Sequence, residues 1–403
     1  MQRTDFKKLD LSRLPPLCFV VDEVAVRQNL EILADVQARS GAKILGALKA
    51  FSMWSLGDLT ASYLSGTCSS GLHELQLAHD YYSGDDAIDK ENAAEHHCFS
   101  AAYAEEDLKK ILGIAHTVVF NSFSQWQRFQ PLIHDAKQAR PELRFGLRIN
   151  PEHSEGEVPI YDPCAPGSRL GIPLSQFEKW EAEGSTLDGI SGLHFHTLCE
   201  QDFLPLQRTL AAVEEKFGRF LPGLEWVNFG GGHHITRDDY QRDALVDAIK
   251  EFSDRYDVQV YLEPGEAMAI STGVLVTSVL DVTWNELPQA ILNTSATCHM
   301  PDTLEMPYRA DVADAGQPDE FAYTYRLGGM TCLAGDVIGD YSFAEPLEIG
   351  QRIVFEDMAH YTMVKTTTFN GTKLPAIMLW NSETDVLTLV REFTYDDFKT
   401  RLS

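Results

Sequence analysis

Side chains that could carry out chemistry stand within or at the ends of several apolar runs of the sequence. They are a lysine, two histidines, a carboxylate and a turn of glycines, at Lys49, His194, His196, Glu263 and Gly230–Gly232. A lysine amine can attack a carbonyl group, and a glycine turn can point backbone N–H groups at an anion. Together these residue types could carry out Schiff-base chemistry beside a bound anionic group.

Lys49 is the candidate nucleophile. It follows an apolar run and precedes Ala50 and Phe51, so we expect its side chain to be buried. A buried lysine loses its charge easily, and the neutral amine is a nucleophile suited to a Schiff base. A lysine at a strand end is more often an ordinary surface lysine, so this interpretation depends on the other groups.

The turn formed by Gly230, Gly231 and Gly232 is the candidate phosphate site. Glycine lets the backbone approach a ligand closely, and successive N–H groups can then bind an anion. The residues that follow contain no Gly-Lys-Ser/Thr, which excludes a Walker loop. The alternative is an ordinary strand-to-helix turn.

The two histidines lie two residues apart, so on a strand they share one face. No H-E-x-x-H or similar ligand spacing occurs, and we therefore expect no metal site. A structural role is the simpler interpretation of His194, whereas His196 could cover an aromatic cofactor ring. Glu263 could pair with a protonated ring nitrogen, or it could be a helix-terminal or surface charge.

The elements that would position these groups form a regular series. Eight short apolar runs alternate with amphipathic stretches such as 105–115 and 242–255, which predicts a (β/α)8 barrel. The runs are 43–50, 66–70, 97–102, 117–122, 144–150, 190–197, 226–231 and 258–264. Catalytic groups of such barrels lie at the C-terminal ends of the strands, where the candidates above also stand.

A second domain follows the barrel. Its apolar runs are rich in β-branched and aromatic residues, with few helical stretches between them, which predicts an all-β domain of sandwich or barrel type. The runs are 274–282, 290–292, 352–355, 376–379 and 386–390. We expect the barrel to span 16–268 and the β domain to combine 1–15 with 269–403.

Composition limits the possible functions. The chain has 403 residues and a net charge of −27, a field that repels nucleic acid and attracts cations. The seven cysteines form no C-x-x-C pair, which favours reduced thiols. No apolar run reaches membrane-spanning length and the start is polar, so we expect a cytoplasmic protein without nucleic-acid or membrane partners.

The ordered set Lys49, His196, Gly230–Gly232 and Glu263 resembles the pyridoxal-5′-phosphate (PLP) decarboxylases with an alanine-racemase-like fold, which include ornithine, arginine and diaminopimelate decarboxylases. The segment 329–336, which contains Cys332, and the segment 358–362, which contains Tyr361, resemble the family's C-terminal motifs. Within this group the sequence motifs are most similar to those of the carboxynorspermidine (carboxyspermidine) decarboxylases. The matching segments are 47–52, 192–200, 228–234, 263–267 and 295–307.

The resemblance implies a role for each residue. Lys49 would carry PLP, His196 would stack on its ring, and Glu263 would keep its ring nitrogen protonated. Gly230–Gly232 and Tyr361 would hold the phosphate, and Cys332 would protonate the substrate α-carbon from the partner subunit of a homodimer. The reaction would release CO2 from a carboxylated polyamine.

Two departures from the ornithine and diaminopimelate enzymes bear on the substrate. Glu266 stands where they usually have arginine, and Leu333 stands where they have an acidic residue. Both argue against ornithine and diaminopimelate, and the change from a cation to the anionic Glu266 favours a longer cationic substrate. The buried ammonium groups of such a substrate need carboxylates or other oxygen acceptors. The candidates for these partners are Glu266, ranked first, and Asp302, Glu305 and Asp336. The alternatives are a diaminopimelate or other basic amino-acid decarboxylase, a racemase, and an inactive polyamine-regulatory homologue.

Overall fold

The computed structural model describes residues 4–84, 94–156 and 159–403, which divide into two compact units. The barrel unit is Asn29–Met268, and the sheet unit combines the residues up to Gln28 with Ala269–Ser403. In the described part of the chain, no helix is both long enough and apolar enough to span a membrane.

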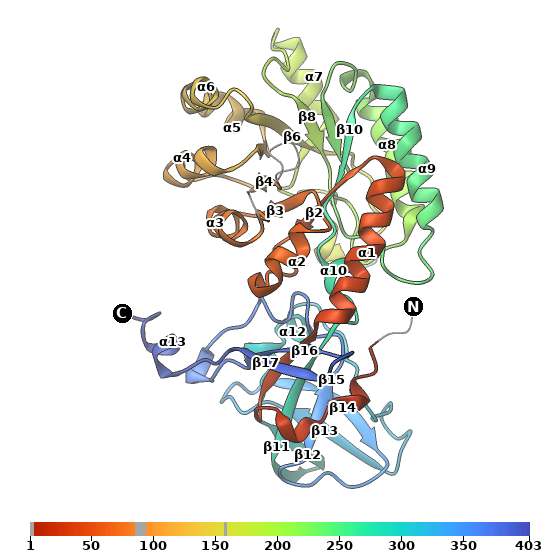
Figure 1. Ribbon diagram of the computed structural model, residues 1–403, viewed down its shortest axis with the longest axis vertical. Helices are drawn as coiled ribbons and strands as arrows, with labels where there is room; N and C mark the ends of the chain where they lie inside the picture. Colours follow the sequence, from red (N-terminus) through yellow and green to blue (C-terminus); the bar gives the residue numbers. More distant parts are fainter. Residues whose placement is uncertain (1–3, 85–93, 157–158) are drawn as a thin grey trace. The chain divides into compact units, whose positions relative to one another are not determined.

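The barrel unit contains a closed ring of parallel strands (Figure 1). Within the described residues the ring has eight strands, which confirms all eight expected runs. They are β2 (Lys43–Ala47), β3 (Gly66–Ser69), β4 (Glu95–Phe99), β5 (Thr117–Phe120), β6 (Arg144–Asn150), β8 (Gly192–His194), β9 (Trp226–Asn228) and β10 (Gln259–Leu262). β10 pairs with β2 and β5 pairs with β6, so the ring closes, and β7 (Ile172–Pro173) extends β6.

Helices follow the strands of the ring, as a (β/α)8 barrel requires. The two amphipathic stretches expected as helices are α4 (Glu105–Ile114) and α9 (Arg242–Tyr256). The others are α2 (Gly57–Ala61), α3 (Leu72–Tyr81), α5 (Phe123–Arg128), α6 (Gln130–Ala139), α7 (Leu174–Ala182), α8 (Phe203–Phe217) and α10 (Glu266–Ala269), and α1 (Glu23–Ser40) precedes the first ring strand.

Trp226 is the largest side chain packed inside the ring. It is fully buried and packs with Leu45, Val119 and Tyr261. A Cβ atom on Gly192 would lie 2.1 Å from the Trp226 ring, so the absence of a side chain on β8 makes room for it. The core of this unit is therefore a filled barrel interior.

The sheet unit is built on a mixed sheet. Its strands run in the order β14 (Val337–Phe343), β13 (Tyr323–Gly328), β12 (Leu287–Leu292), β11 (Gly273–Asn285), β1 (Cys18–Asp22), β16 (Ala376–Asn381) and β17 (Val386–Arg391), and β15 (Arg352–Phe355) pairs with β11. In its described residues the sheet unit also contains the short α-helices α11 (Ala296–His299), α12 (Asp302–Glu305) and α13 (Tyr395–Lys399).

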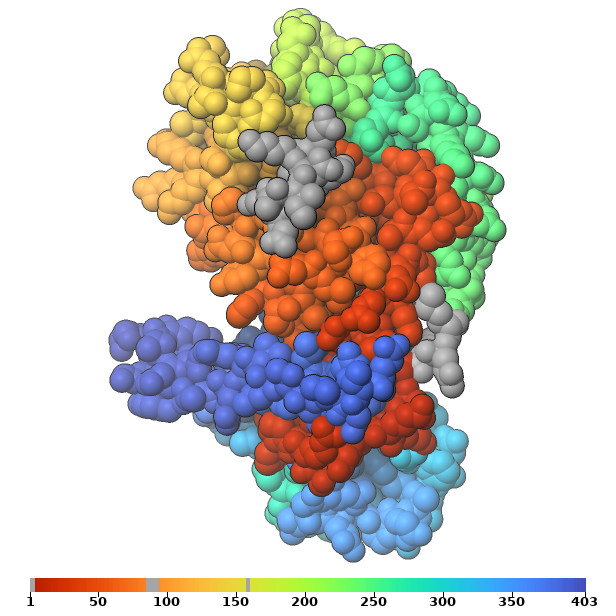
Figure 2. Space-filling model, viewed as in Figure 1, coloured from red at the N-terminus to blue at the C-terminus, as the bar shows by residue number. Residues whose placement is uncertain are grey.

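The division between the units differs from the boundary expected near residue 16. β1 lies between β11 and β16, antiparallel to the first and parallel to the second, so residues 18–22 are part of the sheet unit. Figures 1 and 2 show the red N-terminal residues beside the blue C-terminal strands of this unit. The apolar strand Cys18–Asp22 is fully buried there, which accounts for its sequence.

Candidate active site

One pocket lies at the C-terminal ends of the barrel strands and brings together three predicted residues. Lys49 follows β2, His196 follows β8 and Glu263 follows β10. The remaining lining residues come from five strands and the segments after them: Ala47, Cys68, Ser69, Ser70, Phe99, Arg148 and His194. The barrel topology therefore joins groups that are more than 200 positions apart in the sequence.

Glu263 is held as an anion by two donors. Nδ2 of Asn228 donates to Oε1 at 2.7 Å, and Nε2 of His194 lies 3.1 Å from Oε2. Burial alone would raise the pKa of Glu263, but His194, His97 and the Asn228 hydrogen bond outweigh it and lower the pKa to about 2. Burial also lowers the pKa of His194, which therefore donates to Glu263 as a neutral ring.

His196 is fixed in one neutral form. Its pKa lies well below the ordinary value because of burial and the nearby charges of Lys49 and Arg148. The backbone N–H of Gly231 donates to Nδ1 at 3.0 Å, which assigns the ring hydrogen to Nε2. The glycine turn thus sets the position of the imidazole.

The turn itself has room only for glycine. A Cβ atom would lie 2.4 Å from the Phe195 carbonyl oxygen at Gly230, 2.1 Å from the Glu263 carbonyl oxygen at Gly231, and 1.9 Å from the Leu198 carbonyl oxygen at Gly232. Gly230 and Gly232 also have φ values of +72° and +81°, which favour glycine. These groups fit PLP. They are an amine, a neutral imidazole, an ionised carboxylate and a close-packed glycine turn.

The expectation that Lys49 is buried was wrong. Leu48 and Ala50 are buried, but the Lys49 side chain is exposed where it meets the pocket. The chain turns after Ala47, with Ala50 N–H donating to the Ala47 carbonyl, so the two apolar neighbours pack inward and the lysine does not. Burial in the polypeptide is therefore not what would make this amine nucleophilic.

Arg148 is a further residue of the pocket that no motif in the sequence identified. Its guanidinium lies 4.7 Å from the centre of the Phe99 ring and donates to the His196 carbonyl at 3.1 Å. Burial lowers its pKa to about 10, so the side chain remains a cation at neutral pH. An arginine between the apolar residues Leu147 and Ile149, in the buried part of a parallel strand, was the signal that could have identified it.

Glu266, the first candidate for substrate recognition, lies at the start of α10 in the barrel unit. Its Oε2 atom lies 3.0 Å from Nε2 of His234, the second residue after the glycine turn. Both side chains are largely buried. The pair connects the segment after the turn to α10.

The remaining predicted residues lie in the sheet unit. Asp302 and Glu305 on α12 both pair with Lys365, Glu305 at 2.6 Å. Asp336 is buried, and its carboxylate accepts hydrogen bonds from Ser295, from the backbone of Thr297 and from Thr331.

The other two predicted residues of the sheet unit are a cysteine and a tyrosine. Cys332 is exposed, and its Sγ lies 3.3 Å from Oδ1 of Asn370. Tyr361 has a φ of +45°, and its carbonyl accepts from the Lys365 N–H at 2.9 Å. A left-handed backbone is uncommon outside glycine and identifies this turn as strained.

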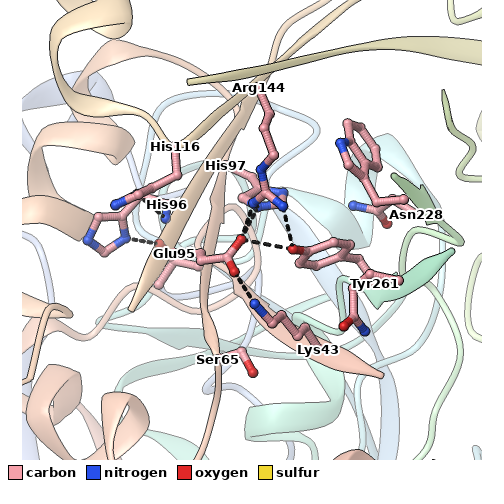
Figure 3. Close-up of polar contacts among 12 residues, drawn as sticks. Lys43, Ser65, Glu95, His96, His97, His116, Arg144, Asn228 and Tyr261 are labelled. Carbon is pink, nitrogen blue, oxygen red and sulfur yellow. Dashed lines mark hydrogen bonds and ion pairs between the residues drawn. The ribbon is translucent and has the colours of Figure 1, made fainter. Parts of the chain in front are cut away.

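A second polar cluster lies at the opposite, N-terminal ends of the strands (Figure 3). Glu95 pairs there with Lys43 and Arg144, and accepts from the Tyr261 hydroxyl at 2.9 Å and from Nε2 of His97 at 3.1 Å. In (β/α)8 barrels this end contributes to stability and not to catalysis. Among the described residues, no three His, Cys, Asp or Glu side chains are placed to hold a metal ion.

Comparisons with known proteins agree with this arrangement. Residues 18–359 match the family described as pyridoxal-dependent decarboxylase, C-terminal sheet domain. The carboxynorspermidine/carboxyspermidine decarboxylase of Campylobacter jejuni is 43% identical over 396 residues, 95% of this chain and 97% of that protein. The carboxyaminopropylagmatine decarboxylase of a Synechocystis species is 40% identical, over 97% of this chain and 96% of that protein.

The fold has solved counterparts. The crystal structure of Campylobacter jejuni carboxynorspermidine decarboxylase with norspermidine aligns with a TM-score of 0.83 and 41% identity, covering 96% of this chain and 99% of that chain. Diaminopimelate decarboxylase from Helicobacter pylori, in complex with L-lysine, aligns with a TM-score of 0.79 at 16% identity, over 98% of this chain and 99% of that chain. The second likeness supports the fold alone.

Proposed function

The chain belongs to the pyridoxal-dependent decarboxylases, and we propose that it releases the α-carboxylate of carboxynorspermidine and carboxyspermidine as CO2, leaving norspermidine and spermidine. The observation that carries this proposal is the 43% identity, over nearly the full length, with a relative of that name. A second relative of the same name, from Herminiimonas arsenicoxydans, is 38% identical over 96% of the chain.

Residues of the barrel pocket would hold the cofactor. Lys49 would bind it through the ε-amine, and His196 would cover its ring. The backbone of the Gly230–Gly232 turn, which has no side chains to block a close approach, would contact its phosphate. When bound, PLP supplies an electron sink for the pair of electrons that the departing CO2 leaves behind. Glu263, ionised and fixed by His194 and Asn228, would keep a proton on the ring nitrogen, which strengthens that sink.

Two residues of the sheet unit complete the proposed set. Tyr361 would contribute its hydroxyl to the phosphate. The Cys332 thiol, supplied by a second copy of the chain, would donate the proton that replaces CO2 on the substrate α-carbon. We therefore propose a homodimer, and we retain the cytoplasm as its proposed location. The exposure of Cys332 supports a role toward another molecule.

The substrate's amines would be bound by carboxylates. Glu266 remains the first candidate because it is a largely buried carboxylate in the same unit as the pocket. Asp302 and Glu305 are the next candidates, and a substrate ammonium group would have to compete there with Lys365, which pairs with both. The full set of hydrogen bonds to Asp336 supports a structural role for that residue instead.

A second candidate substrate is carboxyaminopropylagmatine. The 40% identical Synechocystis relative has that name, and its substrate ends in a guanidinium group where carboxynorspermidine ends in an ammonium group. Carboxylates bind both cations, but the planar guanidinium pairs best with a carboxylate that can accept two parallel hydrogen bonds. Diaminopimelate decarboxylases are more distant, with 27% identity over 59% of the chain in Archaeoglobus fulgidus.

Reconstitution tests this proposal. The purified chain should bind PLP, absorb visible light and release CO2 from carboxynorspermidine, and Lys49→Ala should lose both the absorbance and the turnover. A protein that binds no PLP would refute the chemistry. A coloured protein without turnover of any carboxylated polyamine would refute the substrate class.

A further inference from the structure

One buried side chain connects two parts of the pocket that would bind opposite ends of the cofactor. Asn228, the last residue of β9, is fully buried. Its Oδ1 atom accepts a hydrogen bond from the Gly230 N–H at 2.8 Å, and its Nδ2 atom donates to Oε1 of Glu263 at 2.7 Å. Gly230 belongs to the phosphate turn, whereas Glu263 would contact the ring nitrogen.

We infer that Asn228 is a positioning residue that couples the glycine turn to Glu263. An amide group is planar, with its acceptor and its donors on opposite sides. Once the Gly230 N–H fixes the acceptor side, the NH2 group must point at Glu263. The distance between phosphate turn and carboxylate is then set by one rigid side chain. This inference rests on the proposed PLP chemistry and adds a residue to it.

The same turn also fixes the third cofactor contact. The Gly231 N–H donates to Nδ1 of His196 at 3.0 Å. A shift of the turn would therefore move His196 along with Glu263, because each is bonded either to the turn or to Asn228. The alternative is that Asn228 only satisfies a buried N–H group at a strand end.

Asn121 provides a matched control for that alternative. It is also buried, follows β5 in the same unit, and has the same pair of bonds. Its Oδ1 atom accepts from the Gly171 N–H and its Nδ2 atom donates to the Arg169 carbonyl, both at 2.7 Å. Neither partner is one of the residues proposed to bind the cofactor. Replacing either asparagine by alanine removes one bond accepted from a glycine N–H and one bond donated by the amide, to a carboxylate for Asn228 and to a backbone carbonyl for Asn121.

The experiment compares Asn228→Ala, Asn121→Ala and Asn228→Asp with the wild-type chain. The dissociation constants of PLP and of pyridoxal, which lacks the phosphate, are measured by equilibrium dialysis. The free energy of unfolding is measured beside them. We expect Asn228→Ala to weaken PLP binding about 10-fold or more and to reduce the preference for PLP over pyridoxal. Asn121→Ala should lose stability without changing either constant.

Asn228→Asp separates the bond accepted from Gly230 from the bond donated to Glu263. It also provides a test if the alanine variant does not fold. It keeps an acceptor for Gly230, so PLP affinity should stay near the wild-type value. It places a second carboxylate against Glu263, which raises the pKa of one of the two. The pH dependence of the bound cofactor's visible absorption should then shift by about one unit or more.

Three results would overturn the inference. The first is that Asn228→Ala binds PLP and pyridoxal with wild-type dissociation constants. The second is that both alanine variants lose the same amount of PLP affinity. The third is that the pH dependence of cofactor absorption is unshifted in Asn228→Asp. If the wild-type chain itself binds no PLP, the proposed function fails instead.

Discussion

Nε2 of His194 lies 3.1 Å from Oε2 of Glu263, with both side chains enclosed in the barrel pocket. A carboxylate in this setting would be neutral without a donor, because burial penalises its charge. The ring nitrogen of PLP would then face a carboxylic acid and would not stay protonated. His194 therefore has a specific effect on Glu263 and not merely a packing role.

Replacing His194 tests this effect through pH. His194→Phe removes the hydrogen bond, so the pKa of Glu263 should rise. Because activity requires the carboxylate, the acidic limb of the kcat profile should move to higher pH, by about one unit or more. A profile of unchanged shape with a uniformly lower kcat would show that His194 only packs the pocket.

Replacing Glu266 tests substrate recognition. Glu266→Gln removes the charge expected to bind a substrate ammonium group. KM for carboxynorspermidine should rise about 10-fold or more, with kcat and PLP affinity nearly unchanged. An unchanged KM would exclude Glu266 as a substrate ligand. A loss of PLP affinity would instead assign the Glu266–His234 pair to the support of the glycine turn.

Replacing Asp336 should affect folding. Its carboxylate accepts from the hydroxyl groups of Ser295 and Thr331 and from two backbone N–H groups. Asp336→Asn places an NH2 group against some of these donors, and we expect the free energy of unfolding to fall by about 1–3 kcal/mol. KM should stay the same. A raised KM at unchanged stability, measured by urea denaturation beside steady-state kinetics, would return Asp336 to the substrate site.

Glu95 should stabilise the barrel in a pH-dependent way. Burial raises its pKa, but His97, Arg144 and Lys43 outweigh this and the pKa lies below the ordinary value. The contribution to stability is then complete above the ordinary carboxylate pKa of about 4.3 and is lost as pH falls below it. Glu95→Gln leaves the partly buried cations Lys43 and Arg144 without their carboxylate. It should cost about 1–3 kcal/mol at pH 7.

The control for Glu95 is a surface ion pair. Glu105 pairs with Lys109 on α4, and both side chains are about half exposed. Glu105→Gln should leave the free energy of unfolding unchanged in urea denaturation. Equal effects of the two substitutions, or an effect of Glu95→Gln that is as large at pH 3 as at pH 7, would contradict this assignment.

The sequence predicts the barrel well because each ring strand is a short apolar run between helices. Strands β13 and β14 were missed because they are partly exposed and carry polar residues such as Arg326 and Asp340, which pair across the sheet. β1 was missed because its partners lie more than 250 positions away. Strand pairing over such distances leaves no local pattern in the sequence.

The candidate site was only partly predictable for the same reason. The motifs identified Lys49, His196, the glycine turn and Glu263, all of which stand at strand ends. The hydrogen bonds of Asn228 and His194 to Glu263 join three different strands, and only the closed ring brings them together. The exposure of Lys49 depends on how the chain turns after Ala47, which apolar neighbours alone do not determine.

The most direct test of the proposed function is parallel measurement of CO2 release. The PLP-loaded protein is given carboxynorspermidine, carboxyspermidine, carboxyaminopropylagmatine, meso-diaminopimelate and ornithine at equal concentrations. We expect turnover of the first two, with kcat/KM about 100-fold or more above the others, because a buried carboxylate placed for one cation is left unpaired by the wrong substrate. Equal or faster turnover of any of the other three would contradict the assignment of this chain to carboxynorspermidine and carboxyspermidine.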